Sequence, residues 1–177
     1  MAWPKNVRRA DLRKTLPFVS GSFDAVYSSH VLEHMYRVEA LGVLKEAWRI
    51  LRPGGTCRML VPDLKAIVQE YLGERTLPGD SGAADDRARQ MCRRLLMRRE
   101  ESPRRGLIYG AYTALTDFHE HKWMYDGPSL VKLMTEAGFG EVRERPFRDS
   151  SIPHIEKVEQ EGRVLGGAGV AAEGVKS

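Results

Sequence analysis

Cysteine is scarce in this sequence, and long apolar runs are missing from it. Only two of the 177 residues are cysteines, Cys57 and Cys92, and neither belongs to a CxxC pair or to another metal-ligand spacing. A disulfide framework or a structural zinc site is therefore not expected, and the cysteine usage is typical of a reducing compartment. No apolar run approaches the ~20 residues that span a bilayer, and residues 1–9 lack the apolar core of a signal peptide. We therefore expect a cytoplasmic chain that does not cross a membrane.

The composition is that of a folded domain. Hydrophobic residues make up 42% of the chain and charged residues 29%, which is enough for one domain with its own core. The formal net charge of +4 is uneven, because eight arginines and only two acidic residues lie between Arg87 and Arg105. This bias favours an anionic partner, but a solvated helix face is the simpler interpretation. We do not expect nucleic acid as the partner, because the segment lacks interleaved aromatic residues for base stacking.

Strand and helix patterns alternate along the chain. Residues 23–29 are nearly continuously apolar, with Phe, Val and Tyr, which is typical of a strand covered on both faces. Apolar residues at spacings of three and four predict a helix over residues 38–51, which Pro53-Gly54-Gly55 ends. The remaining expected elements are a strand over 56–61, a helix capped by Asp63 and ending near Leu72, helices over 85–101 and 128–137, and strands over 141–147 and 169–175.

This alternation predicts an α/β protein with a mostly parallel sheet and helices on its faces. We expect a single domain over residues 1–177, with a helical insertion or substrate cap over residues 73–125. Ligands of open α/β sheets lie outside the carboxyl ends of the strands. Asp11, residues 28–34 and Asp63 all follow predicted strands. We therefore expect these residues to converge on one crevice.

One set of motifs resembles a known enzyme family. In order along the chain it comprises Asp11-Leu12, Leu16-Pro17-Phe18, Ser22-Phe23-Asp24, the segment His30-Val31-Leu32-Glu33-His34, and Pro53-Gly54-Gly55. Together these resemble the second half of the class I S-adenosylmethionine (SAM)-dependent methyltransferase domain, of the methyltransferase type 11-like kind. The resemblance implies a partial Rossmann-like sheet, SAM as the cofactor, and methyl transfer to a small-molecule, sugar or glycan-linked acceptor.

The resemblance also implies roles for individual residues. Asp11 stands where the family places an acid that accepts a hydrogen bond from the adenine amino group, and the backbone of Leu12 stands where an amide meets the ring. The expected cofactor-binding residues are Asp11, Leu12, Ser28, Ser29, His30 and Glu33, and the expected catalytic residues are His34, Asp63 and His121. Two simpler interpretations stay open: Asp11 makes a turn after a strand, and Glu33-His34 orders the chain after the next strand.

A second polar cluster spans residues 119–125 and contains His119, His121 and Tyr125. With Tyr109-Gly110 before it and Ala137-Gly138-Phe139 after it, this cluster resembles the late part of a bacterial subgroup known as predicted SAM-dependent methyltransferases. His121 is our first choice for a base or acceptor contact on the substrate side. His30 and His34 would share a helix face at a spacing of four if a helix began near Ser29. We predict no metal, because a metal would need a third ligand.

The glycine-rich loop that lies against SAM in this family has no counterpart before Asp11. We therefore expect an N-terminally incomplete domain that binds SAM weakly by itself. The family places its first strand beside the strand expected here over residues 23–29, which would then have an open edge. A second copy or a partner chain could pair with that edge, the fold could be loosened, or residues 7–10 could fill the gap. The alternative function is that of a non-catalytic interaction protein that pairs through this edge.

Overall fold

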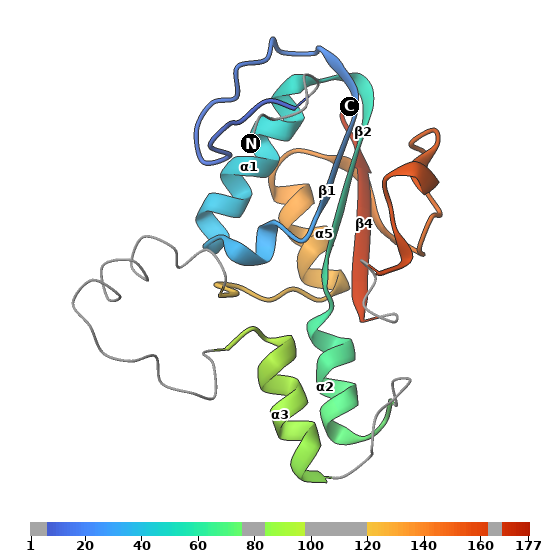
Figure 1. The fold of residues 1–177 in the computed structure, drawn as a ribbon. Coiled ribbons are helices and arrows are strands. Elements are labelled where there is room, and N and C mark those ends of the chain that lie inside the picture. Colours follow the sequence, from blue (N-terminus) through green and yellow to red (C-terminus); the bar gives the residue numbers. More distant parts are fainter. Residues whose placement is uncertain (1–6, 76–83, 98–119, 163–167) are drawn as a thin grey trace, which may run out of the picture.

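The computed structural model describes residues 7–75, 84–97, 120–162 and 168–177 (Figure 1). Strands and helices alternate in the first half, and a second group of elements returns to the same sheet. In chain order the elements are β1 (Phe23–Ser29), the 3-10 helix η1 (Leu32–His34), α1 (Arg37–Ile50), β2 (Leu51–Pro62), α2 (Leu64–Leu72), α3 (Ala84–Arg94), α5 (Gly127–Glu136), β3 (Gly140–Arg145), the 3-10 helix η2 (Ile155–Lys157) and β4 (Gly169–Val175).

The strands form one mixed sheet in the order β1-β2-β4-β3. β1 pairs with β2 in parallel, with Val26 opposite Cys57, whereas β4 is antiparallel to both β2 and β3. The predicted α/β class is confirmed, but the prediction of a mostly parallel sheet was wrong, since two of these three pairings are antiparallel. Parallel neighbours need a long crossover, usually a helix. Between β3 and β4 the described chain contains only the short helix η2 and no long crossover helix. β4 therefore lies between β2 and β3 and runs antiparallel to both.

The core lies between the sheet and the two helices α1 and α5, which cover one face of the sheet and contact each other (Figure 1). β2 is at its centre, because Cys57, Met59 and Val61 are each 1% exposed or less. These side chains meet fully buried residues of the two helices, among them Leu44 of α1 and Leu130 of α5. The apolar faces read from the sequence are therefore the faces that pack.

β2 begins five residues earlier than predicted, so Pro53-Gly54-Gly55 lies within it. The predicted end of the preceding helix is nevertheless nearly right, since α1 ends at Ile50. Gly54 has a φ of 77°, a left-handed conformation that favours glycine. At Gly55 an added Cβ would lie 2.9 Å from the carbonyl oxygen of Arg52. The two glycines thus allow the chain to turn closely at the start of the strand.

β1 is an edge strand of the described sheet, because β2 is its only partner there. Residues 7–10 form no strand and are exposed. The option that they fill the edge is therefore not observed. The other edge, β3, carries four charged residues, Glu141, Arg143, Glu144 and Arg145, whereas β1 carries only Asp24. Charges on an edge strand oppose pairing with another chain.

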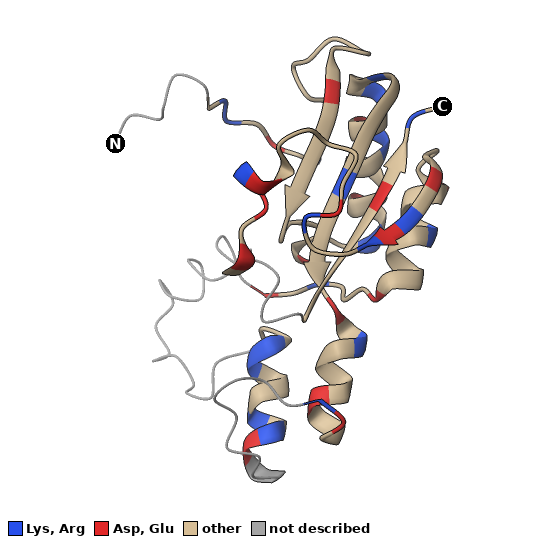
Figure 2. Cartoon of the chain, turned by 90° about the vertical axis from the view of Figure 1, so that its right-hand side faces the viewer, with Lys and Arg blue, Asp and Glu red and all other residues tan. Residues whose placement is uncertain are grey.

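The predicted insertion over residues 73–125 is described only in part. α3 packs against α2, and its arginines are visible in Figure 2. Two of them lie near acidic residues: Arg94 is 3.6 Å from Glu70, and Arg89 is 3.8 Å from Asp86. α3 ends at Arg94 and residues 95–97 are not helical, so the predicted continuation of this helix was wrong there; residues 98–101 and the arginines after Arg94 lie outside the described residues. Its role as a substrate cap stays a prediction. In the described parts of the chain, no helix is both long and apolar enough to cross a bilayer.

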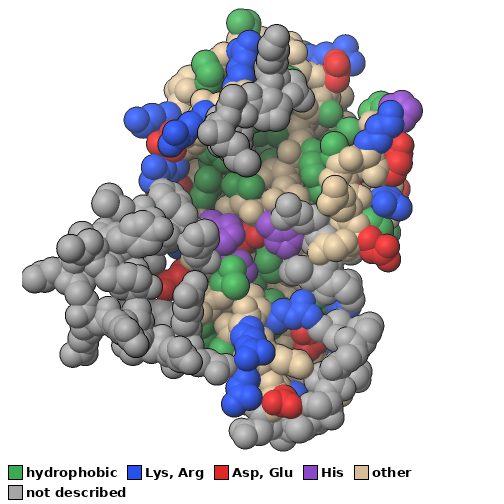
Figure 3. All heavy atoms as spheres, in the orientation of Figure 1, with side chains coloured by type: hydrophobic (Ala, Val, Ile, Leu, Met, Phe, Trp, Pro, Cys, Tyr) green, Lys and Arg blue, Asp and Glu red, His purple; other side chains and the backbone are tan. Residues whose placement is uncertain are grey.

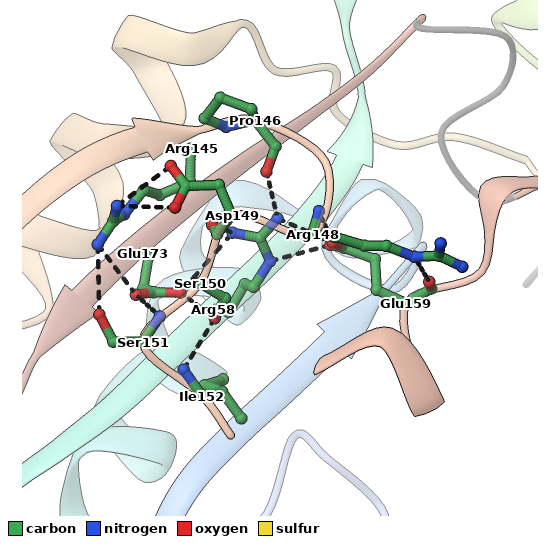
Figure 4. A network of polar contacts seen from close by, with 10 residues as sticks. All are labelled: Arg58, Arg145, Pro146, Arg148, Asp149, Ser150, Ser151, Ile152, Glu159 and Glu173. Carbon is green, nitrogen blue, oxygen red and sulfur yellow. Dashed lines mark hydrogen bonds and ion pairs between the residues drawn. The ribbon is translucent and has the colours of Figure 1, made fainter. Parts of the chain in front are cut away.

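A buried arginine holds the segment after β3 against the second face of the sheet (Figure 4). Arg58, at the centre of β2, is 0% exposed. Its guanidinium donates to Glu159 at 2.9 and 3.0 Å, and to the carbonyl oxygens of Pro146 and Asp149 at 2.9 Å each. Glu173 of β4 lies 3.7 Å from the same guanidinium. Neither the position nor the partners of this arginine stand out in the sequence.

Substitution Arg58→Met is expected to destabilise the fold strongly, because it leaves buried carboxylates without their cation. Breaking a buried pair in this way costs about 3–5 kcal/mol. Arg52→Met is the matched control on the same strand. Arg52 pairs with Asp24 at 2.8 Å, but both side chains are more than half exposed, so its loss should cost less than about 1 kcal/mol. Urea unfolding of the two variants measures the difference, and equal costs would contradict the structural role of Arg58.

Candidate active site

The candidate site begins at the carboxyl end of β1. His30 follows the strand directly, and its amide donates to the carbonyl oxygen of Leu60 on β2 at 2.9 Å. The φ of His30 is 56°, in the left-handed region that non-glycine residues seldom adopt. The helix that could have begun near Ser29 is absent, and the chain instead makes the short 3-10 turn η1 from Leu32 to His34. The sharp bend after β1 turns Glu33 inward.

Glu33 is the buried centre of this site. Its side chain is 1% exposed, and its Oε1 lies 3.1 Å from Nδ1 of His30 and 4.0 Å from Nε2 of His34. Its backbone carbonyl accepts hydrogen bonds from the amides of Lys122 at 2.7 Å and Trp123 at 3.2 Å. These two bonds attach residues 120–125 to η1, although the segments are far apart in the sequence.

This attachment brings His121 beside His34. Their ring centroids are 5.0 Å apart in an edge-to-face arrangement. Figure 3 shows histidine side chains gathered around an acidic one near the middle of one face of the molecule. Burial lowers the pKa of His121; Glu33 opposes this effect, whereas His34 and His30 add to it. A neutral imidazole in this position can accept a proton or a ligand.

A cavity of about 220 Å³ opens beside the cluster. Apolar and charged side chains share its wall. The lining residues are Arg13, His30, Val31, His34, Met35, Glu39 and Lys122. This cavity lies where ligands bind in open α/β sheets, at the carboxyl ends of strands.

Asp11 and Leu12 lie in the chain before β1, close in sequence to the cavity residue Arg13. The Asp11 carboxylate accepts from the amide of Arg13 at 3.1 Å and from its Nε at 3.0 Å. These hydrogen bonds lower the pKa of Asp11, so it is ionised and able to accept further bonds. Leu12 is half-buried. Asp11 thus makes a turn, which was the simpler of the two interpretations given above. This turn does not prevent its carboxylate from also binding a ligand at the rim of the cavity.

Ser28 and Ser29 end β1, opposite Met59 and Leu60 of β2. The hydroxyl of Ser29 is buried and has no hydrogen-bond partner among the described residues. His119 lies outside the described residues, so its predicted proximity to His121 is not described.

Asp63 is placed apart from the histidines. Its carboxylate caps α2 by accepting from the amide of Lys65 at 3.0 Å. It lines a different cavity of about 450 Å³, together with Glu144, Arg145, Glu159 and residues of β4. The structure thus brings His30, Glu33, His34 and His121 together, but it does not place Asp63 in the same cavity. The catalytic role of Asp63 stays a prediction.

Sequence reasoning overlooked Tyr125 as a site residue. It is 1% exposed, pairs with Asp63 through an isolated parallel bridge, and its hydroxyl has no hydrogen-bond partner in the described structure. Burial raises the pKa of Tyr125 to about 12, so the hydroxyl stays protonated and can donate. Its position in the polar segment 119–125 is the feature of the sequence that could have identified Tyr125 as a site residue.

The fold and this site define a Rossmann-like α/β protein with a histidine–carboxylate cluster at its strand ends. A methyltransferase domain family matches residues 2–59, which contain most of the motifs quoted above. The resemblance to methyltransferases is thereby confirmed over residues 2–59. The finer subgroup stays a prediction.

Several solved structures are similar in fold. A SAM-dependent methyltransferase, possible histamine N-methyltransferase, from Thermotoga maritima is 21% identical with a TM-score of 0.47, over 95% of this chain and 62% of that chain. A putative methyltransferase in complex with the Trm112 methyltransferase activator of Haloferax volcanii is 16% identical with a TM-score of 0.49, over 94% and 59%. A possible exported protein from Bordetella parapertussis is 13% identical with a TM-score of 0.50, over 95% and 43%.

This chain therefore spans less than two thirds of the length of each of these structures. A search of curated proteins finds no match to the sequence. At these identities the likeness concerns the fold.

The capping role of Asp63 predicts a specific pattern of stability. Asp63→Ala should lower the free energy of unfolding by roughly 1 kcal/mol, because the amide of Lys65 loses its acceptor. Asp63→Asn should cost little, since asparagine caps a helix about as well as aspartate. Thermal or urea unfolding of both variants checks this. Equal losses in the two variants would show that the charge of Asp63, rather than its cap, supports the fold.

Proposed function

We propose that this chain acts in SAM-dependent methyl transfer to a small-molecule, sugar or glycan-linked acceptor. One observation carries the proposal: His30, Glu33, His34 and His121 meet beside a cavity at the carboxyl end of β1. The same strand end lies within the segment that matches the methyltransferase domain family. Site and family resemblance thus point to the same end of the sheet.

The cavity formed by the described residues is large enough for only part of the SAM molecule. Pockets that enclose a drug-sized ligand measure about 300–1,000 Å³, whereas this cavity measures about 220 Å³. The ionised carboxylate of Asp11 would accept from the adenine amino group, and the amide of Leu12 would meet the ring. Ser28, Ser29, His30 and Glu33 would face the remainder of the cofactor. When bound, SAM supplies an electrophilic methyl group on its sulfonium.

Residues on the acceptor side have a different task. Methyl transfer is an in-line displacement, so positioning the reactants contributes most, about 7–11 kcal/mol in favourable cases. A base is needed only if the acceptor must lose a proton. The lowered pKa of His121 suits it for that role, and His34 lies against its ring. Asp63 would contact the acceptor from the other cavity, which it lines.

A titration with SAM followed by amide NMR tests this function. We expect weak binding to the isolated chain, with shifts at Leu12, Ser29 and His30 and none at Val142 and Arg143 of β3. The expected weakness follows from the small volume of the cavity. Asp11→Asn should reduce the shifts further, whereas Asp24→Asn, an equally isosteric change on an exposed carboxylate, should not. Failure to see shifts at millimolar SAM would refute the proposal, and micromolar affinity would refute the expected weakness.

The β1 edge favours a second candidate function, that of a protein that pairs with a second copy or a partner chain. β1 has one strand neighbour in the described sheet and carries a single charge. Strand addition to such an edge is a recognised binding mode.

Self-pairing predicts a dimer that dissociates on dilution, as measured by size-exclusion chromatography with light scattering. Ala25→Lys places a charge on β1 and should abolish the dimer. Arg143→Glu, on the opposite edge strand, should leave it intact. A wild-type chain that is monomeric at all concentrations argues against self-pairing and leaves the catalytic proposal in place.

A further inference from the structure

Three side chains with metal-ligating atoms meet beside the cavity. They are Glu33, His34 and His121, and one ligand atom of each lies within 4.8 Å of those of the other two. Two of them come from η1, and the third comes from the segment that the Glu33 carbonyl attaches. The third ligand that the sequence did not supply is therefore provided by the fold.

Several oxygen and nitrogen atoms of these groups have no hydrogen-bond partner among the described residues. Glu33 is 0% exposed as a residue, and neither of its carboxylate oxygens accepts a hydrogen bond from the described residues. Nδ1 of His34 and Nδ1 of His121 are buried and also lack partners there. Burying a carboxylate without hydrogen bonds is costly unless a cation compensates it. The nearby ion-pair partner of Glu33 is His30, whose Nδ1 lies 3.1 Å from Oε1 of Glu33.

We propose that Glu33, His34 and His121 bind a divalent first-row transition metal of the zinc type. Two imidazoles and one carboxylate form a recurrent three-ligand set that leaves a coordination position open. Ligand atoms on a tetrahedral zinc ion are about 3.3–3.5 Å apart, given bonds of about 2.0–2.1 Å. The present separations, up to 4.8 Å, are longer than this, so the side chains would have to move closer when the ion binds. Imidazole ligands disfavour magnesium and calcium, which prefer oxygen.

The surroundings suit such an ion. Its charge would compensate the buried carboxylate, and His30 would act as an outer partner that orients Glu33. His34 also lines the cavity, so the open coordination position faces the ligand space. There it would take an oxygen of the acceptor, a hydroxyl or a carboxylate, and His121, as a ligand of the ion, would then not act as the base. This contact with the acceptor rests on the proposed methyl transfer, whereas the metal site itself does not.

Cobalt substitution tests the site without any assay of activity. The chain is treated with a chelator, dialysed, and titrated with Co²⁺ while visible absorption is recorded. One equivalent should bind, and Zn²⁺ should displace it, whereas excess Mg²⁺ should not. Glu33→Gln and His121→Ala should each weaken binding at least about tenfold, since even the outer partners of metal ligands are worth 10–100-fold. Zn²⁺ should also raise the melting temperature of the wild type but not of the variants.

His154→Ala is the matched control, because His154 lies 3.5 Å from Glu156 in an exposed histidine–glutamate pair. It should leave Co²⁺ binding unchanged. His121→Ala alters a partly exposed segment, so it keeps the test valid if Glu33→Gln fails to fold. The proposal is overturned if no saturable Co²⁺ signal appears, or if both site variants bind as the wild type does. Metal binding without SAM binding would refute only the proposed function, and SAM binding without metal binding would refute only this inference.

Discussion

The backbone carbonyl of Glu33 is the point on which the candidate site depends. It accepts two amides from residues 122 and 123, and this joins the turn after β1 to a segment almost ninety residues later in the chain. Without this junction His34 and His121 would have no reason to be neighbours. The junction is possible because His30 adopts a left-handed conformation that turns the chain sharply at the strand end. A strained residue at this position is typical of sites whose geometry serves a function.

A second constraint holds the opposite face of the sheet. Arg58 projects from β2 and binds carboxylate and carbonyl oxygens of residues 146–159 (Figure 4). The two faces of the sheet are thus covered in different ways. α1 and α5 cover one face with apolar side chains, whereas an ion pair and its hydrogen bonds hold an irregular segment on the other. Such a pair specifies one arrangement, since a misplaced segment would leave the buried guanidinium unsatisfied.

Local patterns predicted much of the fold. β1 has the predicted bounds, and α1 ends near the predicted residue. Asp63 caps α2, which ends at Leu72 as predicted. The prediction of a mostly parallel sheet was wrong because the direction of a strand depends on how the chain connects it to its neighbours. Local residue patterns do not encode these connections. Most of the candidate site residues, though not Tyr125, could be named from the sequence, but their grouping could not. Asp63 shares a strand-end position with the histidines and nevertheless lines another cavity.

The sequence by itself determined the α/β class, the positions of most helices and strands, and the family resemblance, because periodicity, capping residues and short motifs act over a few neighbouring residues. Tertiary structure alone decided which polar side chains meet. The Glu33–His34–His121 cluster and the Arg58–Glu159 pair each join residues about ninety to one hundred positions apart. Such contacts depend on the crossing of the chain over the sheet, and only the packing of the whole domain sets that path.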